Sequence, residues 1–83
     1  MKQPSISPMY RLQHEAVQDA WVLLYPEGMV RLNAPAAEVL KRCDGTRSIE
    51  ALIAELCAAF GGADLGADAR TFLDDAARRG WIG

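Results

Sequence analysis

The order of apolar and polar residues predicts three short strands in the first 33 positions of the chain. Residues 10–14 alternate between the two kinds, as in a strand with one buried face. Residues 21–25 are apolar throughout, which favours a central strand covered on both faces. Residues 25–28 form a turn, with proline second and glycine fourth. Residues 29–32 then return as a third strand, which we expect to be an edge of an antiparallel meander.

From position 33 onward, apolar residues recur at intervals of three and four and predict helices. Asn33 is suited to cap the first helix, and Pro35 fits its first turn, where a missing N–H costs nothing. The first helix should stop at residues 44–45, Asp and Gly. Its apolar stripe should include Cys43.

Two further helices follow the first. Ser48 should cap the second helix, and the glycine pair at 61–62 should end it. The third helix should begin between residues 64 and 68 and end at Gly80. The apolar pair at 81–82 should fold back on the core, since it is too apolar to lie in water.

The order of these elements predicts an α+β domain of the winged helix-turn-helix type, with a three-stranded antiparallel sheet followed by three α-helices. Eighty-three residues and 9.0 kDa are enough for one domain, which we assign to residues 9–83. Residues 1–8 contain two prolines and two serines. We expect them to form a flexible N-terminal arm.

Composition narrows the class of function. A net charge of −2 and a pI of about 5.2 argue against nucleic-acid binding, which normally needs a basic face. No apolar run approaches the ~18 residues of a membrane span, and the first residues lack the apolar core of a secretion signal. With only two cysteines and no disulfide framework, we expect a cytoplasmic protein with free thiols.

The residues that most often perform chemistry are scattered. His14, Cys43 and Cys57 fall on a strand and two helices without metal-ligand spacing, and both cysteines are expected to pack as small core residues. The adjacent carboxylates at 74–75 point ~100° apart on a helix and do not converge on one atom. No glycine-rich phosphate loop is present. We therefore expect no enzymatic activity, no metal and no cofactor.

A winged-helix fold suggests DNA binding by analogy, but charge opposes it. The third helix, which would enter the groove, has an excess of acidic residues, and the second helix has two glutamates and no basic residue. A winged-helix DNA-binding regulator remains the alternative function. A further possibility is a homodimer whose strand edges pair with each other.

The exposed backbone of the third strand offers a different kind of site. An unpaired edge presents a row of N–H and C=O groups that an extended peptide can complete as an added strand. The third helix should run beside this edge and supply a wall for the side chains of the guest. The alternative is that residues 29–32 are merely a short, protected edge.

Four segments of the sequence together resemble the PqqD family of pyrroloquinoline quinone (PQQ) biosynthesis. They are residues 23–33, which contain Tyr-Pro-Glu-Gly and Leu-Asn, residues 36–45, which end in Cys-Asp-Gly, residues 48–53 and residues 78–82. The resemblance extends over about residues 8–82. The order of these motifs is specific, although each alone would be weak.

The resemblance implies a peptide chaperone without catalytic activity. The family binds the precursor peptide PqqA, delivers it to the radical SAM enzyme PqqE, and gives its name to the recognition elements that capture leader peptides as an added strand. Mapped onto this sequence, the guest would pair mainly with the backbone of residues 30–32, and Arg31 with Arg78 or Arg79 would contact its acidic or carbonyl groups. The implied peptide-binding residues are Met29, Val30, Arg31, Leu32 and Asn33 on the strand, and Arg70, Phe72, Asp75, Arg78 and Arg79 on the helix.

Overall fold

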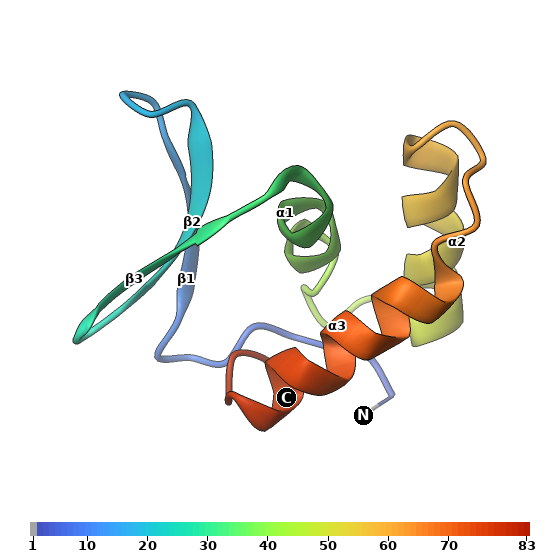
Figure 1. Ribbon diagram of the computed structural model, residues 1–83. Coiled ribbons are helices and arrows are strands. Elements are labelled where there is room, and N and C mark those ends of the chain that lie inside the picture. The colour runs from blue at the N-terminus through green and yellow to red at the C-terminus, as the bar shows by residue number, and fades with distance from the viewer. Residues whose placement is uncertain (1) are drawn as a thin grey trace.

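A computed structural model describes residues 2–83 and shows a small sheet on one side and three helices on the other (Figure 1). In chain order the elements are β1 (Arg11–Glu15), β2 (Ala20–Tyr25), β3 (Gly28–Leu32), α1 (Ala34–Lys41), α2 (Ile49–Ala59) and α3 (Gly66–Arg78). The predicted α+β class, with three strands followed by three helices, is confirmed. Within residues 2–83, none of these helices has the length and apolar character that a membrane span requires.

The sheet is an antiparallel meander with β2 in the centre, so β1 and β3 are both edges. Cross-strand partners share a face, and one such row joins Leu12, Leu23 and Val30. Leu23 is completely buried, so this row faces the core. The other face lies away from α1 and carries the row formed by Gln13, Val22 and Arg31.

Two helices begin at the residues expected from their capping chemistry. The Oδ1 of Asn33 accepts a hydrogen bond from the backbone N–H of Ala36 at 2.9 Å, and the Oγ of Ser48 accepts one from Ala51 at 3.1 Å. These bonds satisfy donors that the first turn of a helix leaves free. The third helix differs, since Leu65 precedes it and supplies no side-chain cap. That missing signal explains why the sequence located its start only to within five residues.

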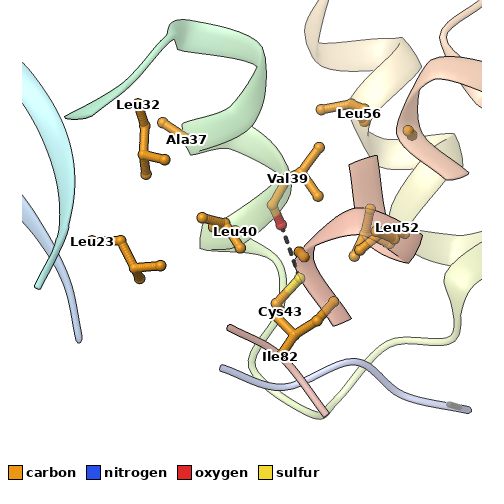
Figure 2. Close-up of a cluster of buried hydrophobic side chains, with 12 residues drawn as sticks. Leu23, Leu32, Ala37, Val39, Leu40, Cys43, Leu52, Leu56 and Ile82 are labelled. Carbon is orange, nitrogen blue, oxygen red and sulfur yellow. Dashed lines mark hydrogen bonds between the residues drawn. The ribbon is translucent and has the colours of Figure 1, made fainter. Parts of the chain in front are cut away.

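The core joins the sheet to all three helices (Figure 2). Leu23 and Leu32 project from the sheet toward α1, and Leu52 and Leu56 approach it from α2. Ile82 is 3% exposed, which confirms that the end of the chain folds back. The cluster of buried residues is Leu23, Leu32, Ala37, Val39, Leu40, Cys43, Leu52, Leu56, Ala69, Leu73, Ala76 and Ile82.

The two cysteines differ in their surroundings. Cys43 lies just beyond the end of α1 rather than on its stripe, and its thiol donates to the carbonyl of Val39 at 3.3 Å (Figure 2). Burial raises the pKa of this thiol to about 11, so it stays neutral and unreactive near pH 7. Cys57 is only half-buried, and both thiols are free.

The N-terminal residues are not the free arm that the sequence suggested. Pro4 is buried, and the amide of Ile6 donates to the carbonyl of Cys43 at 3.0 Å. Ser5 and Gly83 exchange two backbone hydrogen bonds of 3.2 and 2.9 Å. Residues 4–7 are therefore fixed between the loop after α1 and the end of the chain. Residue 1 lies outside the described part.

Candidate functional site: the β3 edge and the adjoining hollow

The open edge of β3 presents the backbone of alternate residues. A turn of two residues joins β2 to β3, so Tyr25 and Gly28 form the hydrogen-bonded pair that closes the hairpin. Hydrogen-bonded and non-hydrogen-bonded pairs then alternate along the two strands. The amides of Val30 and Leu32 therefore donate to β2. The N–H and C=O groups of Met29 and Arg31 point away from the sheet. The outward-pointing backbone groups thus belong to residues 29 and 31, whereas the sequence predicted pairing with a guest along residues 30–32.

The side chains of β3 divide between the two faces of the sheet. Leu32 is 8% exposed and Val30 packs against the core, so both hold the strand in place. Met29 and Arg31 lie on the face away from α1, and Met29 is 52% exposed. Within residues 2–83, Arg31 has no ion-pair partner. Asn33 is exposed, but its side chain is occupied by capping α1.

An apolar hollow of about 260 Å³ adjoins the end of β3. It lies between the start of α1 and one flank of α3, with α2 as its floor. Asn33 connects this hollow to the strand edge, and Phe72 is the largest side chain in its wall. The lining residues are Asn33, Pro35, Ala36, Val39, Leu56, Leu65, Asp68, Ala69 and Phe72.

The two flanks of α3 face different surroundings. Phe72 lines the apolar hollow, whereas Arg70 borders a separate depression of about 100 Å³ with Ile49, Leu73 and Asp74. Residues two positions apart on a helix lie about 200° apart around its axis. The structure therefore does not bring Arg70 together with Phe72, and the helical wall implied by the resemblance is divided.

The C-terminal part of α3 carries a connected group of charged and aromatic side chains. The Nε of Arg79 donates to a carboxylate oxygen of Asp75 at 2.7 Å, and its guanidinium lies 5.5 Å from the ring centre of Trp81. Trp81 in turn contacts Phe72, with ring centres 6.4 Å apart. Arg78 approaches Asp75 only to 3.8 Å, and its side chain is 77% exposed. The side chain of Arg78 is therefore more exposed than that of Arg79.

Sequence reasoning missed most of the hollow. The sequence predicts Pro35 only as a residue of the first turn of a helix, yet together with Ala36 it forms one wall of the hollow. Leu65 directly precedes α3 and Asp68 lies in its first turn, and the sequence did not fix where this helix begins. The sequence signal that could have indicated this wall is the pair of apolar residues, Pro35 and Ala36, that follows the helix cap Asn33. Among residues 2–83, no group of three or more His, Cys, Asp or Glu side chains could hold a metal ion.

Comparison with known proteins identifies the family. The model of the family described as Coenzyme PQQ synthesis protein D (PqqD) matches residues 20–82. A PqqA binding protein from Pseudomonas fluorescens is 45% identical over 82 residues, which are 98% of this chain and 90% of the relative. A PqqA binding protein from Methylococcus capsulatus is 38% identical over 77 residues, 93% of this chain and 83% of the relative.

A solved structure is also similar. It is the solution NMR structure of the PqqD truncation of Methylobacterium extorquens PqqCD, described as a functional, stand-alone recognition element for ribosomally synthesised and post-translationally modified peptides. The match has a TM-score of 0.77 and 26% identity, and covers 96% of this chain and 87% of the other. Together with the sequence matches, this likeness shows that the chain belongs to the PqqD family.

Proposed function

We propose that this protein is a cytoplasmic chaperone of PQQ biosynthesis that binds the precursor peptide PqqA as a fourth strand on β3 and presents it to PqqE. It performs no chemistry itself. The names of its relatives support PqqA as the ligand. The observation that carries the proposal is the open β3 edge, which leads through Asn33 into an apolar hollow.

Backbone pairing provides the general part of the binding. Met29 and Arg31 each offer one N–H and one C=O to an added strand, and each hydrogen bond contributes about 0.5–1.5 kcal/mol net. Four such bonds would hold many peptides weakly. Selectivity for PqqA therefore has to come from side chains of the guest.

The two faces of the added strand would contact different parts of this protein. Side chains on its core face point toward the hollow and Phe72, which favours apolar residues. Side chains on its other face lie beside Met29 and Arg31. An acidic residue there would pair with the guanidinium of Arg31, which lacks an ion-pair partner in residues 2–83.

Amide hydrogen exchange with and without PqqA tests strand addition. In the free protein, the amides of Met29 and Arg31 should exchange fast, whereas those of Val30 and Leu32 should be protected by the sheet. Added PqqA should protect Met29 and Arg31 specifically. Arg31→Pro removes one outward donor and should weaken PqqA binding about tenfold or more while the protein stays folded. A folded Arg31→Pro protein that binds PqqA as well as the wild type would disprove strand addition.

Presentation to PqqE needs its own test. Size-exclusion chromatography of the protein with PqqA and PqqE should show one complex that contains all three chains. If PqqE instead displaces this protein from PqqA, the chaperone role would be wrong even though peptide binding stands.

A further inference from the structure

Residues 4–7 form backbone hydrogen bonds with two separate segments of the chain. On one side they bond to the C-terminal tail, residues 81–83, where the N–H of Ser7 donates to the carbonyl of Trp81 at 2.8 Å. On the other side they bond to the loop after α1, where the N–H of Ile6 donates to a carbonyl at 3.0 Å. The segment is therefore the middle strand of a small junction that joins the tail to the end of α1.

The tail depends on this junction for its position. Within residues 2–83, its other backbone hydrogen bond runs from the N–H of Trp81 to the carbonyl of Ala76 at 2.9 Å. The side chain of Ile82 is buried in the core, whereas that of Trp81 is only partly buried against it. The ends of a chain stay ordered only where they are tied down. The bonds from residues 4–7 therefore determine how firmly Trp81 is held.

Trp81 connects this junction to the apolar hollow beside β3. Its ring contacts that of Phe72, with the ring centres 6.4 Å apart and the two planes inclined at 58°. Phe72 is the largest side chain in the wall of the hollow. A continuous series of contacts thus leads from the backbone of Ser7 through Trp81 to the surface that we propose for the guest.

We propose that residues 4–7 position the wall of the hollow for the guest peptide. They hold the tail, and the tail in turn holds the ring of Trp81 against that of Phe72. Ser7 is the positioning residue with the most direct effect, because its N–H is bonded to Trp81 itself. The effect on PqqA rests on the proposed function, whereas the link from Ser7 to Phe72 is a property of the free protein.

Ser7→Pro tests this link because it removes the N–H that bonds to Trp81. Ile6, which precedes it, lies in an extended bridge with Ile82, and an extended residue accepts a following proline. The matched control is Ser7→Ala, which keeps the N–H. By isothermal titration calorimetry, Ser7→Pro should weaken PqqA binding about three- to tenfold and Ser7→Ala less than about twofold. Circular dichroism should show both variants folded.

A double-mutant cycle with Phe72→Ala separates positioning from general destabilisation. If Ser7 acts through Phe72, then Ser7→Pro should cost less than about twofold in PqqA affinity once Phe72 has been replaced by alanine. A variant that merely destabilises the fold would lose affinity by the same factor in both backgrounds. Equal losses in the two backgrounds would therefore overturn the proposal.

Amide exchange in the wild-type protein gives a readout that needs no variant. Coupling between two sites is reciprocal, so a segment that favours PqqA binding is itself held more firmly when PqqA is bound. Saturating PqqA should slow exchange of the Ser7 amide by about the same three- to tenfold factor. A rate at Ser7 that PqqA leaves unchanged would contradict the coupling, even if Ser7→Pro failed to fold.

NMR of the free protein distinguishes failure of this proposal from failure of the proposed function. A nuclear Overhauser effect between the rings of Phe72 and Trp81 should be present in the wild type and in Ser7→Ala, and weaker in Ser7→Pro. A wild-type protein that does not bind PqqA would disprove the proposed function, while this signal would still decide the positioning role. An unchanged signal in folded Ser7→Pro would refute the link from residue 7 to the hollow.

Discussion

The two edges of the sheet have the same backbone and different neighbours. Both β1 and β3 are five residues long, and both pair with β2. The β3 edge continues at Asn33 into an apolar hollow bounded by three helices. The β1 edge instead carries a charged residue at each end, Arg11 at its start and Glu15, of opposite sign, at its finish. An open strand edge can in principle accept many peptides through its backbone, so the side chains beside each edge should determine which partner it accepts.

Within β3, neighbouring residues also differ in their surroundings and therefore in their roles. Val30 and Leu32 direct both side chain and backbone into the protein, whereas Met29 and Arg31 direct both outward. Substitutions at neighbouring positions of one strand should therefore have opposite consequences for folding and for binding.

The largest effect should come from Val30→Pro. Its amide is committed to β2, so proline removes a ladder bond and leaves a carbonyl of Leu23 without its donor, which should cost roughly 2–3 kcal/mol of unfolding free energy. Arg31→Pro should cost much less, because its amide points to solvent. Urea denaturation followed by circular dichroism measures both. Equal losses would mean that the outward residues are wrongly assigned.

Phe72→Ala should have the next largest effect, on PqqA affinity. Removing the largest side chain of the hollow should weaken binding about 10-fold or more, as truncating a buried aromatic contact does. Arg70→Ala, on the other flank of α3, is the matched control and should change affinity less than about twofold. Isothermal titration calorimetry of both folded variants decides this. If Arg70→Ala weakens binding more, the guest lies on the opposite flank.

A smaller effect, on the stability of the whole fold and so on both sheet edges alike, should follow from Asp44→Asn in the loop after α1. Hydrogen bonds from the hydroxyl and amide of Thr46, with Arg47 nearby, lower the pKa of the Asp44 carboxyl to about 2. Because this pKa lies below its ordinary value of 3.8, the carboxylate stabilises the fold above about pH 4, and that contribution is lost as pH falls through about 2. Thermal unfolding should show Asp44→Asn less stable than wild type at pH 7, by a difference that shrinks steeply between pH 4 and pH 2. A constant difference across this range would contradict the assignment.

The smallest effect should be that of Arg11→Glu on PqqA binding. The substitution should change the dissociation constant for PqqA by less than about twofold, because β1 and β3 are separated by β2. Fluorescence anisotropy with labelled PqqA at low protein concentration measures this. A large change would show that PqqA reaches the β1 edge.

Much of the fold could be predicted because its signals are local. The capping side chains of Asn33 and Ser48 act within three residues, and the apolar run of β2 matches a central strand in which adjacent residues are both buried. The edge position of β3 followed from the turn before it and the helix after it. These features depend on neighbours in the sequence, so the sequence alone contains them.

The parts that could not be predicted depend on long-range packing. Which flank of α3 faces the hollow is determined by how α3 crosses α2 after the positive-φ glycines at 61 and 62, and no periodicity encodes that angle. The pairing of Ile6 with Ile82 joins residues at opposite ends of the chain. The short sequence around Ile6 has neither alternation nor helical spacing, so its fixed conformation is visible only in the folded molecule.

The hydrogen bonds between Ser5 and Gly83 bring the chain close to a closed ring (Figure 1). A short linker that joined Ser5 to Gly83 would span this corner, away from the backbone of β1 and β3. New ends could then be opened at Gly61 and Gly62, which lie in an exposed turn that leads into an irregular segment rather than into an element of the core. Such a circularly permuted chain should keep its fold and carry attached groups on the helical side of the molecule, away from the sheet.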